Sequence, residues 1–173
     1  MNKFEIINAN AEKVASAIHD VLGTSAKPSI LLLLRWIEEN FGVKIEINHT
    51  YSEEFKQSGL VYYDPQKGCY MVWINANEPE KRKVFTICHE FGHILLNSRK
   101  AFGFSDGEIY SKKGEERFCD HFAAAFLMPK DIFIQKWNSC SETLDFKKVR
   151  MTSIFKVSGL AIYYRAKELG LIL

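Results

Sequence analysis

Residues 85–97 read FTICHEFGHILLN, and their apolar residues recur at the spacing of a helix that packs one face into a core. Residues 89–93 of this stretch form the pattern HExxH. Residues four apart on a helix project from the same side, so His89 and His93 can converge on one metal ion. Glu90 lies about 100° further round the helix, where its carboxylate can act as a general base. The stretch therefore predicts a buried helix that carries part of a hydrolase site.

A third ligand must come from elsewhere, because a catalytic zinc usually has three protein ligands and one open position. Chance alone would produce HExxH in about one sequence of this length and composition in a hundred, so the surrounding residues must decide whether the pattern marks a metal site. Glu116, on the next predicted helix, is the best candidate. Asp120, one turn later, could accept the second ring N–H of a ligand histidine. We predict a Zn²⁺ site with ligands His89, His93 and Glu116, and Glu90 as the catalytic base.

Other acidic and histidine residues compete with Glu116 for the ligand role. Glu115 points about 100° away from Glu116 on the helix. Asp106 and Glu108 fall in a predicted loop, and His121 lies on a neighbouring face of the same helix. These positions make all four weaker candidates.

Two further features bear on the site. Gly92 costs its helix about 1 kcal/mol relative to alanine, which suggests that another backbone approaches closely there; the alternative is a tolerated defect. Peptide hydrolysis often needs an additional donor to the oxyanion. The sequence does not choose among five candidates for this donor, which are Tyr62, Tyr63, Tyr70, Tyr110 and His121. Cys88 and Cys119 are interpreted as small buried apolar residues.

Periodicity and turn residues predict an α+β fold. Helical spacing extends over residues 11–22 and 28–41, and β-rich runs cover residues 43–47, 59–63 and 69–74. We expect a small, mostly antiparallel three-stranded sheet beside the HExxH helix, which should span residues 80–97. A loop over residues 98–114, which could either wall a cleft or be a solvated connection, a helix over residues 115–128 and two or three short helices over residues 130–173 complete the prediction.

The chain shows no internal repeat and no linker, so a single domain over residues 1–173 is expected. Its predicted parts are N-terminal helices over residues 1–42, the sheet and metal-site helices over residues 43–129, and C-terminal helices over residues 130–173. The net charge of +2 gives no strong reason to expect nucleic acid or a membrane as a partner. Four dispersed cysteines and the lack of a signal or spanning segment predict a cytoplasmic protein with reduced thiols.

The paired stretches FTICHEFGHILLN and ERFCDHFAAAFLMP, the second over residues 116–129, resemble the signature of the ImmA/IrrE family of zinc metallopeptidases. The ending FKVSGLAIYYRAKELGLI, residues 155–172, is similar to the family's usual C-terminus. The resemblance implies a zincin-like core, with His89, His93 and Glu116 as zinc ligands and Glu90 as the catalytic residue. Cys119 stands where the family often has alanine, and Asp120 where asparagine is frequent.

The resemblance also implies a regulatory protease that cleaves a helix-turn-helix repressor of a phage or mobile element and so acts as an anti-repressor. The alternative is a non-proteolytic, zinc-containing regulator that binds a repressor partner or DNA. Arg165 and Lys167 in the last helix are faintly like a DNA-reading element. The near-neutral charge disfavours direct nucleic-acid binding. Packing against the core explains the apolar residues of this helix more simply, and these are Leu160, Ile162, Tyr163 and Leu169.

Overall fold

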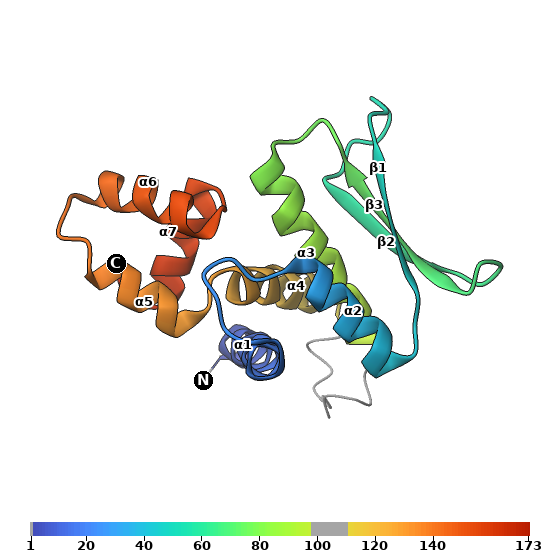
Figure 1. The fold of residues 1–173 in the computed structure, drawn as a ribbon, viewed down its shortest axis with the longest axis horizontal. Helices are drawn as coiled ribbons and strands as arrows, with labels where there is room; N and C mark the ends of the chain where they lie inside the picture. Colours follow the sequence, from blue (N-terminus) through green and yellow to red (C-terminus); the bar gives the residue numbers. More distant parts are fainter. Residues whose placement is uncertain (1, 98–110) are drawn as a thin grey trace.

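Helices precede and follow a small sheet along the chain, and the sheet lies at one edge of the molecule (Figure 1). The computed structural model describes residues 2–97 and 111–173. The elements in these ranges are α1 (Lys3–Leu22), α2 (Ile30–Phe41), β1 (Ile45–Thr50), β2 (Gly59–Asp64), β3 (Cys69–Asn75), α3 (Glu80–Asn97), α4 (Lys112–Leu127), α5 (Lys130–Asn138), α6 (Leu144–Phe155) and α7 (Gly159–Glu168). The predicted α+β class is confirmed.

The first helix is longer than expected, because it begins at Lys3 and not near residue 11. Asn2 caps it: the Asn2 side chain accepts a hydrogen bond from the backbone N–H of Glu5, and the Glu5 side chain accepts one from the backbone N–H of Asn2. This reciprocal capping box satisfies two backbone donors that a helix start otherwise leaves unpaired. The pattern N-x-x-E was therefore the signal for the additional turns.

The sheet has three strands, as predicted, in the order β1-β3-β2. β2 and β3 form the expected antiparallel hairpin, whereas β1 pairs with β3 in parallel, so the sheet is mixed and not mostly antiparallel. β3 is the most apolar strand, with Met71, Val72 and Ile74 buried, and it takes the central position. Residues 51–58 carry the chain from one edge of the sheet to the other, which leaves room for β3 in between.

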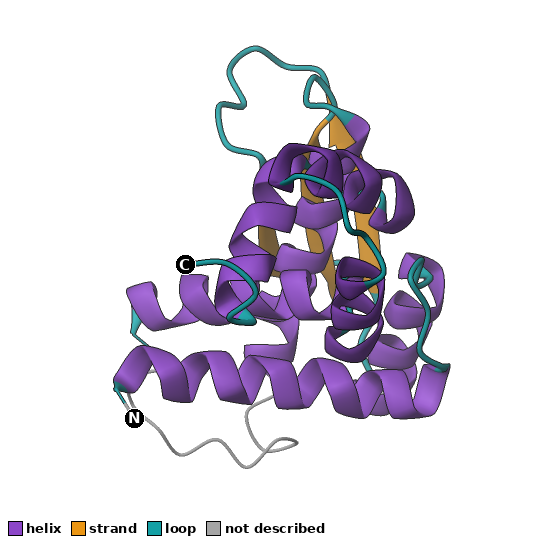
Figure 2. Cartoon of the chain, turned by 90° about the vertical axis from the view of Figure 1, so that its left-hand side faces the viewer, coloured by secondary structure: helices purple, strands orange, loops and turns teal. Residues whose placement is uncertain are grey.

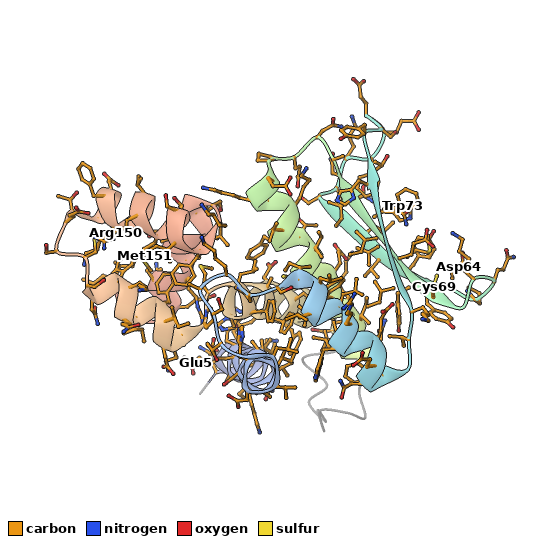
Figure 3. All side chains as sticks on the ribbon, viewed as in Figure 1. Glu5, Asp64, Cys69, Trp73, Arg150 and Met151 are labelled. Atoms are coloured by element: carbon orange, nitrogen blue, oxygen red, sulfur yellow. The ribbon has the colours of Figure 1, made fainter. Side chains whose placement is uncertain are left out.

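The inner face of the sheet packs on α3, and α3 packs on α4, which also contacts α1 along much of its length (Figures 1 and 2). Val72 and Ile74 belong to the core beneath the sheet. Trp73 points to the opposite side, away from the helices (Figure 3). Phe118, Phe122 and Phe126 stack along the buried side of α4. α4 is therefore the central helix, between α1 and α3.

The second motif helix starts earlier than predicted, at Lys112, because Ser111 caps it and accepts a hydrogen bond from the backbone N–H of Gly114. Most of the predicted loop over residues 98–114 lies outside the described residues. Asp106, Glu108 and Tyr110 lie outside them as well. No helix in the described part of the chain is both long and apolar enough to cross a membrane.

Candidate metal centre

The site is built where α3 crosses α4. A Cβ atom placed on Gly92 would lie 3.0 Å from Cα of Cys119, so the two helix backbones are in close contact at this point. The close backbone approach predicted from Gly92 is therefore confirmed. It brings the side of α3 that carries both histidines next to the first turns of α4, where Glu116 lies one turn before Cys119.

The structure brings the side chains of His89, His93 and Glu116 together. Nε2 of His89 lies 3.3 Å from Oε2 of Glu116, and Nε2 of His93 lies 3.3 Å from Oε1 of the same carboxylate. Two ligand atoms of a tetrahedral zinc, each about 2.1 Å from the ion, are separated by about 3.4 Å. The two observed spacings, one to each oxygen of the Glu116 carboxylate, match this value, so the carboxylate is placed relative to each imidazole as neighbouring ligands of one ion would be.

Asp120 holds the first histidine in place. Nδ1 of His89 lies 2.8 Å from Oδ1 of Asp120, and donation of the Nδ1–H to this carboxylate leaves Nε2 with a free lone pair. Burial lowers the pKa of His89, but the hydrogen bond and charge of Asp120, with the charges of Glu90 and Glu116, outweigh burial and raise it. Asp120 therefore contacts the ring nitrogen of His89 that does not face Glu116.

The pKa of His93 is shifted in the opposite direction from that of His89. Burial lowers the pKa of His93, and the neighbouring His89 lowers it further, while Glu116 and Asp120 act against this change. A neutral imidazole is the form that binds a metal. His93 is therefore poised to present Nε2 as a lone-pair donor.

Glu90 is buried, with 6% of its surface exposed, on the turn of α3 that carries His89. Burial raises the pKa of Glu90 to about 7, with His89 opposing the shift and Glu116 adding to it. A carboxylate with a pKa near neutral is well matched to proton transfer. Glu90 also lines a cleft together with His89, His93 and Glu116.

Gly59, at the start of β2, was not identified from the sequence. A Cβ atom there would lie 2.7 Å from Oε1 of Glu90 and 2.5 Å from Cγ2 of Thr86. The absent side chain therefore provides the space in which the Glu90 carboxylate sits. A glycine inside a β-rich run is the signal that could have found it, since such glycines often mark close contacts.

A second set of donors overlaps the first. Ligand atoms of His89, His93 and Cys119 lie within 4.8 Å of one another. Cys119 is fully buried and packs against Gly92, and burial, followed by the charge of Glu116, raises the pKa of its thiol. A thiol must lose its proton to bind a metal. The Glu116 carboxylate, 3.3 Å from both imidazoles, fits the ion better.

The candidate donors to the oxyanion lie in different environments. Tyr62 and Tyr63 are about half exposed, and Tyr70 packs edge-on against Tyr63. His121 is the one described candidate for oxyanion stabilisation that lines the cleft. Its Nε2 lies 3.1 Å from Glu12 and its Nδ1 3.3 Å from Glu168, so carboxylates accompany both ring nitrogens.

The cleft has a volume of about 1170 Å³. Its walls come from the start of α1, the start of β2, one side of α3, one side of α4 and one side of α7. This volume exceeds the roughly 300–1,000 Å³ of sites for small molecules. The cleft is large enough for a segment of polypeptide.

The last helix does not present its arginine to solvent. Arg165 is fully buried, where Nη1 and Nη2 donate to the two carboxylate oxygens of Glu12 at 2.7 and 2.8 Å. Its Nε–H donates to the carbonyl of Met128. Arg165 therefore ties α7 to α1 and α4 and is not accessible to DNA.

Two imidazoles and a carboxylate around one point, with a buried glutamate beside them in an open cleft, form an arrangement that metal-dependent hydrolases use. The comparisons with known proteins agree with this class. The chain matches the IrrE N-terminal-like domain of peptidase family M78 over residues 39–167, and it belongs to this family. Membership implies a metallopeptidase and confirms the resemblance seen in the two motifs.

Among solved structures, the fold is similar to that of a Mycobacterium tuberculosis transcriptional regulator, with a TM-score of 0.62 and 13% identity. The similarity covers 96% of this chain and 52% of the regulator, so this chain spans about half the length of that protein. At this identity the likeness concerns the fold alone. No curated protein sequence matches the chain.

Proposed function

We propose that the protein is a zinc-dependent endopeptidase in which His89, His93 and Glu116 bind the zinc ion and Glu90 is the general base. The observation that carries this proposal is the pair of 3.3 Å separations between the Glu116 carboxylate and the two imidazole Nε2 atoms. Membership of the M78 peptidase family supports it. Zinc favours imidazole and carboxylate donors at this spacing, and three ligands leave a position open for reaction.

Bound zinc would act as a Lewis acid that polarises the scissile carbonyl and lowers the pKa of a water molecule to about 7. Glu90 accepts the proton from the attacking water on its carboxylate, for which its buried setting suits it. Glu90 then returns this proton to the nitrogen of the leaving amine, so that the peptide C–N bond breaks and Glu90 is restored. Asp120 keeps the His89 imidazole in the tautomer that the site requires.

The free edge of β2 suits the backbone of a peptide substrate. The backbone N–H of Asn75 donates to the carbonyl of Ser58, which marks this as a hydrogen-bonded pair. In an antiparallel ladder such pairs alternate, so the backbone groups of Gly59 and Val61 face away from β3. No strand within residues 2–97 and 111–173 pairs with that edge. An extended peptide could hydrogen-bond there, beside Glu90.

The proposed substrate is a helix-turn-helix repressor of a phage or mobile element, cleaved as a regulatory step. This part of the proposal rests on the resemblance to the ImmA/IrrE family. A repressor encoded in the neighbouring reading frame is the first substrate to test. Incubation of the purified zinc-loaded protein with that repressor should give two fragments, whose masses would locate the cleaved bond.

Three variants test the site. Glu90→Gln should retain zinc and lose at least about a thousandfold in kcat, because the amide cannot accept the proton. Glu116→Ala should bind zinc much more weakly, whereas Cys119→Ala should keep its zinc and activity. Zinc content is measured by elemental analysis after dialysis, and cleavage by electrophoresis or mass spectrometry.

Two results would contradict this assignment. If Glu90→Gln cleaves as fast as the parent protein, Glu90 is not the general base. If Cys119→Ala loses zinc and Glu116→Ala does not, the third ligand is Cys119 and not Glu116. Zinc-dependent binding of the repressor without cleavage by the parent protein would instead favour the non-proteolytic regulator.

A further inference from the structure

Two large apolar side chains on α7 are exposed. Leu160 is 59% exposed and Tyr164 is 56% exposed, although the sequence predicted Leu160 to pack against the core. The two residues are four apart and therefore lie on one side of the helix. The opposite side, with Ile162 and Ala166, is buried. The sequence-based prediction for Leu160 is wrong because α7 contacts the body of the protein through its other side.

Both side chains line the same cleft as the candidate metal centre. α7 lies across from α3, with α4 running between them (Figure 1). Leu60 and Val61 of β2 and Phe85 of α3 also line the cleft. Apolar residues are thus present on three of its walls, among them α3, which also carries Glu90.

α7 is held firmly in this position. Buried Arg165 joins α7 to Glu12 on α1 and to the carbonyl of Met128, which follows α4. Ser158 caps the helix start by accepting a hydrogen bond from the backbone N–H of Ala161. An apolar pair on a fixed helix can discriminate between side chains that enter the cleft. The exposure of these two residues is therefore a property of the folded protein and not of a frayed end.

We infer that Leu160 and Tyr164 are specificity residues that receive a large apolar side chain of the substrate, close to its scissile bond. The inference rests on the proposed peptidase function and adds a substrate preference to it. The occupant is an extended, unfolded peptide segment that carries leucine, isoleucine, methionine, phenylalanine or tyrosine at this position. Burying such a side chain against Leu160 and Tyr164 removes apolar surface of both partners from water, which favours binding. An extended chain fits better than a folded domain, because Leu160 and Tyr164 line the same cleft as Leu60 and Val61 of β2, whose outer edge is unpaired among the described residues.

A degenerate peptide library tests this preference in two ways. The zinc-loaded parent protein is incubated with blocked decapeptides, and the products are sequenced by mass spectrometry to find the cleaved bond. Zinc-loaded Glu90→Gln protein is immobilised in parallel, and the peptides that it retains are sequenced. Cleaved peptides should be enriched at least about tenfold for large apolar residues over glycine at one position within two residues of the bond, and retained peptides should show a matching enrichment in their total content of large apolar residues.

Substitutions in the apolar pair should change this preference. Leu160→Ala and Tyr164→Ala should each reduce the enrichment by about three- to tenfold. Leu160→Asp should shift the preferred residue from apolar to lysine or arginine, which a merely structural role for Leu160 would not produce. Phe146→Ala is the matched control, because Phe146 is 65% exposed on α6 and does not line the cleft. All of these side chains are exposed, so the variants should remain folded, as checked by circular dichroism.

The outcomes separate the inference from the proposed function. Cleavage without an apolar preference, or with a preference that Leu160→Asp leaves unchanged, overturns the inference and leaves the peptidase assignment standing. Apolar peptides retained by Glu90→Gln, with no cleavage by the parent protein, overturn the peptidase assignment and support an apolar binding surface. A protein that neither cleaves nor retains any peptide overturns both.

Discussion

The position of the Glu90 carboxylate depends on Gly59, which has no side chain. Gly59 lies so close to Glu90 that any Cβ would meet the carboxylate at 2.7 Å. The glycine therefore lets β2 approach α3 while the Glu90 carboxylate keeps its place in the cleft. This arrangement buries Glu90, and burial is the main cause of its raised pKa. The position of the Glu90 carboxylate therefore depends on the sheet as much as on its own helix.

Gly59→Ala should therefore impair catalysis without removing the metal. The added methyl must displace Glu90 or move β2 away from α3, and a misplacement on the order of 1 Å can cost about a hundredfold in rate. We expect kcat to fall by about ten- to a hundredfold at unchanged zinc content, measured on a peptide that the parent protein cleaves. Gly159→Ala is the control, since its Cβ would meet only Cγ2 of Thr152, at 3.9 Å. Equal rates for Gly59→Ala and the parent protein would refute this role of Gly59.

At the scale of elements, the crossing of α3 and α4 sets the geometry of the site. His89 and His93 come from one helix and Glu116 from the other, and the contact between Gly92 and the Cys119 backbone fixes their separation. Backbone atoms of a packed helix cannot move aside as a flexible side chain can. The spacing between donors is therefore a property of the helix pair.

Gly92→Ala should separate the two helices by a few tenths of an ångström. Overpacking of this kind costs about 1–3 kcal/mol, and alanine regains up to about 1 kcal/mol of helix propensity. We expect a net loss of about 1–2 kcal/mol in the free energy of unfolding, measured by urea denaturation of the metal-free protein. Zinc affinity should fall as well, measured by competition with a chelating dye. A variant with unchanged stability and zinc affinity would show that the crossing tolerates a side chain.

At the scale of the whole molecule, a partly buried ionic cluster joins helices from the two ends of the chain. Glu12 on α1 contacts Arg165 on α7 and His121 on α4, and His121 also contacts Glu168. Burial acts to raise the pKa of Glu12, but hydrogen bonds from Arg165 and His121 outweigh it and lower the pKa from 4.5 to about 2. The same carboxylates, Glu12 and Glu168, outweigh burial at His121 and raise its pKa above 6.5. The cluster anchors the helix that carries Leu160 and Tyr164.

Glu12→Gln should destabilise the protein by about 3 kcal/mol near neutral pH, since each pKa unit corresponds to about 1.4 kcal/mol and buried Arg165 would lose its partner. Because folding lowers the pKa of Glu12, its carboxylate stabilises the folded state at pH values above the pKa of the unfolded chain, 4.5. This stabilisation is lost as the pH falls from 4.5 towards 2. Because folding raises the pKa of His121, the protonated imidazole stabilises the folded state below pH 6.5. This stabilisation is lost as the pH rises through the pKa that His121 has in the folded state. The difference between parent and variant should therefore be largest between pH 4.5 and 6.5.

Urea denaturation from pH 3 to pH 9 measures this dependence. Glu39→Gln, at an exposed position of α2, is the control for loss of a carboxylate, and its effect should stay within about 0.5 kcal/mol. A difference between the parent and Glu12→Gln that does not shrink below pH 4.5 would show that the ionised carboxylate is not the source of the stability.

The sequence by itself determined the class of fold, the HExxH helix and the candidate residues of the metal centre. Helical periodicity, turn residues and the spacing of His89, Glu90 and His93 are local, so they can be read without the tertiary structure. The turns of α1 before residue 11 were also present locally, in the capping box of Asn2 and Glu5. The close backbone approach at Gly92 could be inferred because a glycine is costly in a helix.

Only the tertiary structure decided how distant segments meet. The parallel pairing of β1 with β3, the space that Gly59 leaves for Glu90, and the contact of Arg165 with Glu12 all join residues that no local spacing relates. Which side of α7 faces the cleft was decided in the same way, because an amphipathic pattern does not say which neighbour will cover it. The residues of the candidate metal centre could be predicted from the sequence, whereas the cleft walls that we propose select a substrate arise from packing.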